Sequence, residues 1–158
     1  MYLGIDSVKN LCVCPLRAEH LPAVASLETA CFADPWSEQA LAVLLSPENV
    51  GFVIMDGAQA LAYGGMTTVL DEGTVTNIAT HPDARRQGLG RQIVSSLLRE
   101  AETRGLEKVF LEVRVSNEAA WRLYEQMNFS RVGLRKNFYR HPTEDAFIME
   151  WSRDEAVR

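Results

Sequence analysis

The sequence predicts a mixed fold, α/β or α+β, with a single domain over residues 1–158 around a central mixed sheet. Three observations predict it: amphipathic helices come early, strand-like runs follow, and the later strands alternate with two further helices. The chain has 158 residues, of which 47% are hydrophobic and 23% charged. This length and composition suffice for one compact core and a ligand cleft.

The first half is expected to contain one strand, two helices and then a run of strands. Asp56-Gly57 is a hairpin turn signal between the first two strands of that run. Each helix follows a plausible start signal. The expected elements are a strand at 11–17, helices at 18–31 and 37–45, and strands at 51–55, 60–70 and 74–80.

The second half of the sequence predicts a long amphipathic helix over 88–104, and Gly105 marks its end. Its apolar stripe consists of Leu89, Ile93, Val94, Leu97, Leu98 and Ala101. A strand at 108–115, a helix at 117–127 and two closing strands at 130–138 and 145–152 follow, the last two joined by a loop that contains Pro142.

The segment 77–91 joins a predicted strand to the long helix through a glycine-rich turn. Gly88 and Gly90 lack a β-carbon, so backbone amides of the turn can close on an anion, and the N-terminus of the next helix adds to the attraction. Positive charge comes from Arg85, Arg86 and Arg91. The segment therefore predicts a phosphate site, and the alternative is a plain strand-to-helix turn.

Two other glycine loops are excluded. No Gly-x-x-x-x-Gly-Lys-Ser/Thr run of the Walker type occurs. The dinucleotide-binding pattern requires a third glycine, but Ile93 follows Gly88-Leu89-Gly90-Arg91-Gln92.

Glu112 is the first catalytic candidate, because it lies in the middle of a strand with Phe110 and Arg114 on its own face and four apolar residues on the opposite face. Those residues are Val109, Leu111, Val113 and Val115. A carboxylate there can take a proton from an ammonium nucleophile, directly or through water. A solvent-facing Glu beside Arg114 is the alternative.

Tyr124 is the second catalytic candidate. Its spacing to Ala120 and Met127 places it on the apolar stripe of a helix, where a buried packing tyrosine is the alternative. A phenol with an ordinary pKa near 10 can also donate a proton to a departing thiolate.

The run Arg85-Arg86-Gln87-Gly88-Leu89-Gly90 resembles the acetyl-CoA loop of the GNAT acyltransferases, which follows the pattern Arg/Gln-x-x-Gly-x-Gly/Ala. The resemblance implies the GNAT fold, a central mixed and mostly antiparallel sheet flanked by about four helices. It also implies that the loop from Arg85 to Arg91 binds the pyrophosphate of acetyl-CoA. The backbone of Ile78, Ala79 and Thr80 is then expected to pair with the pantetheine arm.

Leu111-Glu112-Val113-Arg114-x-Ser116-Asn117 looks like a segment of the N-terminal alanine acetyltransferases of the RimI type, in which this Glu is the general base. Asn117-x-x-Ala120-x-x-Leu123-Tyr124 resembles the segment whose Tyr protonates the coenzyme A thiolate and whose Asn contacts the pantetheine arm. Asn117 can equally be a helix-start residue.

Further segments extend this resemblance over most of the chain, from about residue 14 to residue 149. Asp34-Pro35-Trp36-Ser37-Glu38 is similar to the Phe-Pro-Trp-Ser segment of that subfamily. The resemblance makes Trp36 and Tyr139 candidate contacts of the acceptor peptide, and an aromatic that caps the core is the alternative for each.

The resemblance implies acetyl transfer from acetyl-CoA to the α-amine of a protein N-terminus. It further implies that the acceptor is a small-subunit ribosomal protein that begins with alanine. Two alternatives remain: a broader protein or small-amine acetyltransferase, and a coenzyme-A-binding regulatory module without chemistry. Glu112 and Tyr124 together argue against the module.

Five positions depart from the family pattern. Thr80-His81 replaces Val-Asp, Arg85 replaces a frequent Gln, Phe138 lacks the hydroxyl of the usual Tyr, and Asn128 replaces Gly. Asn tolerates a left-handed helix stop. Phe138 bears on the choice of acceptor, whereas donor binding depends mostly on backbone.

The net charge of −5 argues against a broad nucleic-acid surface and suits a cationic substrate. No run is long enough to span a membrane, and residues 1–16 are not expected to form a targeting signal, because Asp6, Lys9 and Asn10 interrupt their apolar run. The odd number of cysteines, Cys12, Cys14 and Cys31, predicts reduced thiols in a cytoplasmic protein. A metal site is not expected, because the histidines are scattered. The oligomeric state stays open.

Overall fold

The computed structural model describes residues 11–156. The chain divides into two compact units, one formed by the described residues of Met1–Met66 with Asn77–Leu97, the other by Thr67–Thr76 with those of Leu98–Arg158. Three elements carry residues of both units: β3 (Gln59–Val69), β4 (Glu72–Thr80) and α4 (Leu89–Thr103). The single domain stays a prediction, and residues 1–10 of the N-terminal segment lie outside the described part.

The strands form a seven-stranded sheet in the order β1-β2-β3-β4-β5-β7-β6. β1 pairs with β2, β2 with β3, β5 with β7 and β6 with β7 in antiparallel fashion, while β4 and β5 run parallel. The predicted mixed, mostly antiparallel sheet with its helices is therefore confirmed.

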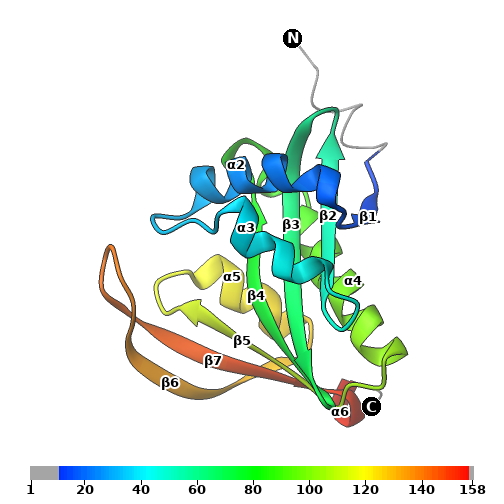
Figure 1. The fold of residues 1–158 in the computed structure, drawn as a ribbon. Coiled ribbons are helices and arrows are strands. Elements are labelled where there is room, and N and C mark those ends of the chain that lie inside the picture. The colour runs from blue at the N-terminus through cyan, green and yellow to red at the C-terminus, as the bar shows by residue number, and fades with distance from the viewer. Residues whose placement is uncertain (1–10, 157–158) are drawn as a thin grey trace. The chain divides into compact units, whose positions relative to one another are not determined.

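In the first unit, helices cover both faces of the β2–β3 hairpin. The further elements of this unit are β1 (Val13–Pro15), η1 (Ala18–His20), α2 (Leu21–Cys31), α3 (Glu38–Leu41), η2 (Ala42–Leu45), β2 (Val50–Asp56) and η3 (Pro82–Ala84). α2 and α3 lie on one face of β2 and β3, and α4 lies on the other (Figure 1). The hairpin turns at Gly57 with a φ of 61°, one residue later than predicted, because Asp56 still pairs with Gln59.

The two faces of this hairpin pack differently. On the α2 side, Val24, Leu27, Val53 and Tyr63 belong to one buried cluster. On the α4 side, a β-carbon at Gly64 would lie 2.5 Å from the Cγ2 atom of Ile93. Gly64 thus allows α4 to approach β3 closely at Ile93.

The second unit is built on an antiparallel three-stranded arrangement. Its elements are β5 (Lys108–Arg114), α5 (Glu118–Gln126), β6 (Phe129–Tyr139), β7 (Glu144–Ser152) and α6 (Arg153–Ala156). β7 lies between β5 and β6, and the β6–β7 hairpin is long and curved (Figure 1). Trp151 on β7 is 1% exposed and belongs to the buried core.

Two predicted helices are shorter than expected. The helix expected at 18–31 is split, because Pro22 lies in the first turn of α2 and the preceding residues form the 3₁₀ turn η1. The helix expected at 37–45 contains one short α-helix, with Ser37 as its N-cap, and then the 3₁₀ helix η2. The strand expected at 11–17 shortens to β1, and α6 was not predicted.

Candidate active site

The glycine-rich turn leads directly into α4. The hydrogen bond from Gln92 N to Gly88 O, 3.1 Å long, opens the helix, and the N-terminus of a helix directs backbone amides outward. Gly88 has a φ of +78°, and a β-carbon there would meet nothing within 4 Å. The turn therefore needs glycine for its backbone conformation, and its open space suits a phosphate group.

The side chains of this turn differ in their surroundings. Arg86 adopts a φ of 65° and, with Gln87, is exposed, whereas Leu89 is buried and anchors the start of the helix. Arg85 Nε donates to Thr80 O at 3.2 Å, and Arg85 Nη2 lies 4.0 Å from Cys31 Sγ. Arg85 therefore holds the end of β4 in addition to adding positive charge at the turn.

The end of β4 presents backbone rather than side chains. The parallel ladder of β4 and β5 ends at Thr74 and Phe110, although β4 continues to Thr80. The side chain of Ala79 is buried in the core, and that of Ile78 would lie 3.5 Å from a β-carbon at Gly64. The carbonyl oxygen of Thr80 accepts from Arg85 Nε and, at 3.4 Å, from Cys31 Sγ.

Glu112 lies in the middle of β5 with the predicted alternation. Val109, Leu111 and Val113 are buried, while Glu112 and Arg114 are half-buried on the other face. The strand pairs Glu112 with Ile148 of β7, so its backbone is fixed in the sheet. The sheet therefore fixes the backbone from which this half-buried carboxylate extends.

Tyr139, at the end of β6, lies in the electrostatic field of Glu112. Burial first, and then the negative charge of Glu112, raise the pKa of Tyr139 to about 12, while Arg114 acts in the opposite direction. The guanidinium carbon of Arg114 lies 4.4 Å from the centre of the Tyr139 ring. Within the second unit, Tyr139 and Glu112 therefore lie close enough for the charge of one to affect the other.

Arg114 also binds the turn of the β6–β7 hairpin. Its Nη1 atom donates to Pro142 O at 3.0 Å and to Glu144 Oε1 at 3.1 Å, and its Nη2 atom donates to Arg140 O at 3.0 Å. Hydrogen bonds from Ser116 first, and then Arg114, lower the pKa of Glu144. The sequence pattern gave no signal for this network, because its partners lie 26 to 30 residues apart.

Tyr124 is buried in α5, with 8% of its surface exposed. Its ring packs against Phe129 with the two ring centres 5.9 Å apart. Burial first, and then Tyr139, raise the pKa of the Tyr124 phenol, which therefore stays protonated at neutral pH. Asn117 caps α5 by accepting from Ala120 N at 3.3 Å, as the helix-start alternative predicts.

Trp36 lies in the loop between α2 and α3, half-buried against the cluster of the first unit. Its backbone N–H donates to Glu28 Oε1 at 2.9 Å. Sequence reasoning missed Glu28, which is fully buried in α2. A signal existed: Glu28 follows Leu21 and Val24 at helical spacing on the apolar stripe, where a carboxylate needs hydrogen-bond partners.

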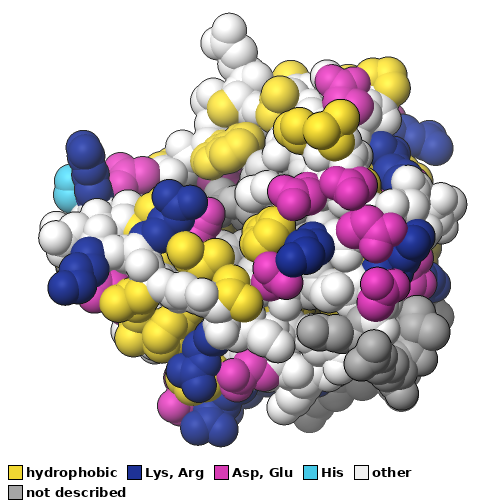
Figure 2. Space-filling view, turned by 90° about the horizontal axis from the view of Figure 1, so that it is seen from below, with side chains coloured by type: hydrophobic (Ala, Val, Ile, Leu, Met, Phe, Trp, Pro, Cys, Tyr) yellow, Lys and Arg dark blue, Asp and Glu magenta, His cyan; other side chains and the backbone are white. Residues whose placement is uncertain are grey.

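Three further features concern the surface charge, the cysteines and the length of the helices. On the face shown in Figure 2, basic and acidic side chains are interspersed among apolar ones. Cys12, Cys14 and Cys31 are free, with 3.9 Å between the sulfurs of Cys12 and Cys14, and the described residues contain no group of three metal-ligating side chains. None of the helices in the described range combines the length and the apolar character that crossing a membrane requires.

Comparison with known proteins agrees with this geometry. The model of the acetyltransferase (GNAT) family matches residues 21–129. The [ribosomal protein bS18]-alanine N-acetyltransferase of Escherichia coli strain K12 is 41% identical over 138 residues, which cover 85% of this chain and 92% of the relative. A putative enzyme of the same name from Bacillus subtilis is 33% identical, with 85% and 90% covered.

A solved structure extends the match to three dimensions. The crystal structure of the ribosomal-protein-S18-alanine N-acetyltransferase from Escherichia coli superposes with a TM-score of 0.83 and 38% identity, covering 90% of this chain and 93% of that chain. The chain therefore belongs to the acetyltransferase (GNAT) family.

Proposed function

We propose that this protein transfers the acetyl group of acetyl-CoA to the α-amine of a protein N-terminal alanine, that of ribosomal protein bS18. The observation that carries the proposal is the 41% identity, over 85% of the chain, to an enzyme named for that reaction. Membership of the acetyltransferase family supports acetyl-CoA as the donor. A metal has no role in this proposal.

The donor is proposed to bind through main chain and positive charge. The amides at the start of α4, from Gly88 to Arg91, take the pyrophosphate, and Arg85, Arg86 and Gln87 lie beside it. The main chain of Ile78 to Thr80 pairs with the pantetheine arm and polarises the thioester carbonyl. The end of the β4–β5 ladder at Thr74 supports this role for the last residues of β4. Asn117 adds a contact to the pantetheine arm.

The chemical step is proposed to be direct. Glu112 takes a proton from the α-ammonium group, and the free amine attacks the thioester carbon. The new C–N bond forms as the C–S bond breaks, and Tyr124 supplies a proton to the departing thiolate. The acylated nitrogen then loses its second proton, Tyr124 regains one, and Glu112 returns its proton to solvent. The Tyr124 phenol is protonated at neutral pH and therefore carries the proton that this step needs. Trp36 and Tyr139 contact the acceptor peptide.

The test uses the whole protein, acetyl-CoA and a peptide that carries the N-terminal sequence of bS18. We expect stoichiometric release of thiol and a peptide heavier by one acetyl group. The control is the same peptide with its α-amine already acetylated, which should release no thiol. Acetylation of spermidine-like amines at a similar rate would favour the broader acetyltransferase, and donor binding without any acetylation would favour the regulatory module.

A further inference from the structure

Glu28 in α2 is a buried carboxylate that the proposed reaction does not use. Its side chain is 0% exposed. Tyr63 donates its hydroxyl to Glu28 Oε2, Asn77 Nδ2 donates to the same oxygen at 2.9 Å, and Trp36 N donates to Oε1 at 2.9 Å. Three donors from three segments therefore converge on one carboxylate.

The chemistry of these partners makes the carboxylate hard to replace. A carboxylate accepts and does not donate when ionised, so it satisfies three donors at once. Burial and the charge of Glu28 raise the pKa of Tyr63, which keeps the Tyr63 hydroxyl a donor. An amide at position 28 would turn an NH₂ group toward one of these donors and leave buried groups unpaired.

The three donors lie where the two substrates are proposed to bind. Trp36 is in the loop between α2 and α3, which carries a candidate acceptor contact. Asn77 directly precedes Ile78, the first residue proposed to face the thioester. Tyr63 lies on β3, so its hydrogen bond connects Glu28 of α2 to a second strand of the sheet. All four residues belong to the first unit.

We propose that Glu28 is a positioning residue that fixes the backbone of the Trp36 loop against β4 and thereby sets the affinity for the acceptor peptide. The proposal rests on the proposed function for the role of Trp36. Glu28 itself touches neither substrate, because it is fully buried. Because Glu28 binds the backbone of Trp36 itself but only the side chain of Asn77, the larger effect is expected on the KM for the peptide and a smaller one on the binding of acetyl-CoA.

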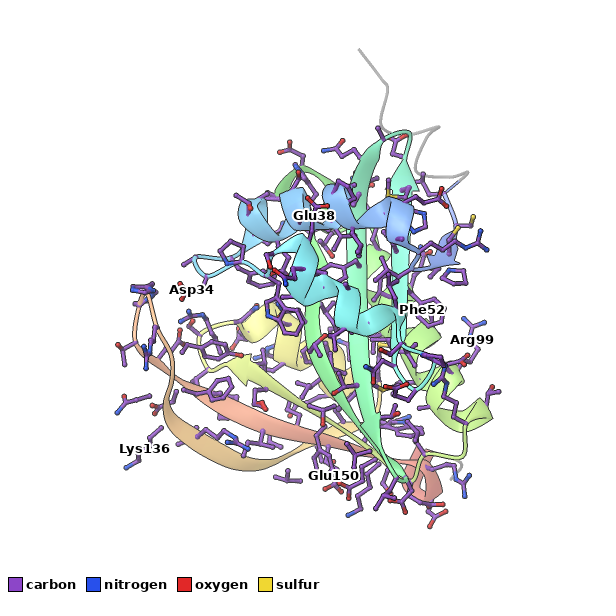
Figure 3. The ribbon with its side chains drawn as sticks, in the orientation of Figure 1. Asp34, Glu38, Phe52, Arg99, Lys136 and Glu150 are labelled. Atoms are coloured by element: carbon purple, nitrogen blue, oxygen red, sulfur yellow. The ribbon has the colours of Figure 1, made fainter. Side chains whose placement is uncertain are left out.

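The test compares Glu28→Gln with Glu38→Gln. Glu38 begins α3 just after the Trp36 loop and is exposed, so its variant makes the same change of charge outside the cluster (Figure 3). We expect Glu28→Gln to raise the KM for the bS18 peptide about tenfold, the size of one lost buried hydrogen bond, while kcat and the Kd for acetyl-CoA change less than about twofold. Glu38→Gln should match the wild type.

A second readout follows the loop directly. The chain has three tryptophans, Trp36, Trp121 and Trp151. With 5-fluorotryptophan and ¹⁹F NMR, the Trp36 signal, assigned with Trp36→Phe, should shift or broaden in Glu28→Gln. The signals of Trp121 and Trp151 should stay, since both lie in the second unit. An unchanged peptide KM and an unchanged Trp36 signal in folded Glu28→Gln would overturn the proposal.

A milder variant keeps the test decisive if Glu28→Gln does not fold. Tyr63→Phe removes one of the three hydrogen-bond donors to Glu28 and keeps the ring. We therefore expect the KM for the peptide to rise as in Glu28→Gln, but only about threefold. No change in KM or in the Trp36 signal would then overturn the proposal. Should the wild type acetylate no peptide, the proposed function fails, while the Trp36 signal still reports whether Glu28 holds the loop.

Discussion

The guanidinium of Arg114 stacks on the ring of Tyr139, with its central carbon 4.4 Å from the ring centre, and donates to two carbonyl groups of the adjoining turn. Arg114 lies two residues after Glu112 on the same face of β5. The strand that carries the proposed base therefore also holds the hairpin end that carries Tyr139. This relationship gives the first prediction.

Arg114→Lys should loosen the hairpin turn. A lysine keeps the charge but loses the planar fork that contacts Pro142 O, Arg140 O and the Tyr139 ring together. We expect about 2 kcal/mol less stability in urea unfolding and a higher KM for the peptide. Arg131→Lys is the matched control, because Arg131 also lies over aromatic rings and pairs with Glu125, but outside this turn. Equal effects of both variants on peptide KM would contradict the prediction.

Glu112→Gln should abolish most turnover and keep donor affinity. Gln fits the same position in β5 but cannot accept a proton, so kcat should fall roughly a hundredfold or more. Calorimetric titration of acetyl-CoA should give the wild-type Kd. A wild-type kcat in the folded variant would refute the assignment of Glu112 as the base.

Tyr124→Phe should slow the release of thiol while the fold stays intact. The change removes only the hydroxyl, and the ring contact with Phe129 is kept. We expect about a hundredfold lower kcat in a continuous thiol assay, together with an unchanged circular dichroism spectrum. Normal steady-state kinetics would show that Tyr124 only packs the core.

Gly88→Ala should weaken donor binding. A φ of +78° costs an L-residue about 1 kcal/mol, although the new methyl group meets no atom within 4 Å. We expect a Kd for acetyl-CoA raised roughly fivefold, because the turn relaxes away from its anion-binding shape. Gly57→Ala is the control: its φ is +61° and its space is equally open, but it lies in the β2–β3 turn. If Gly57→Ala weakened binding as much, the glycine turn would not be the donor site.

Local patterns predicted much of the fold. The alternation along β5 places Glu112 and Arg114 on one face, as the structure has them. The helix-start alternative for Asn117 is confirmed, because Asn117 is the N-cap of α5. Asn128 was expected to tolerate a left-handed stop, and its φ is 74°. Each of these features depends on neighbours within a few residues, which a sequence displays directly.

Contacts between distant segments could not be predicted in this way. Glu28 meets Tyr63 and Asn77 across 35 and 49 residues, and Arg114 meets the hairpin turn across 26 to 30. Only the position of Glu28 on an apolar stripe hinted that it would be buried and hydrogen-bonded. The roles of Glu112, Tyr124, Trp36, Tyr139 and the glycine turn stay predictions.

The most direct measurement of the central claim places the acetyl group within the product. The protein is incubated with acetyl-CoA and a bS18 peptide that contains both its N-terminal alanine and a lysine, and the product is sequenced by tandem mass spectrometry. The proposed function predicts one acetyl group on the alanine α-nitrogen and none on the lysine. Acetyl on the lysine, or an unmodified peptide after prolonged incubation, would contradict it.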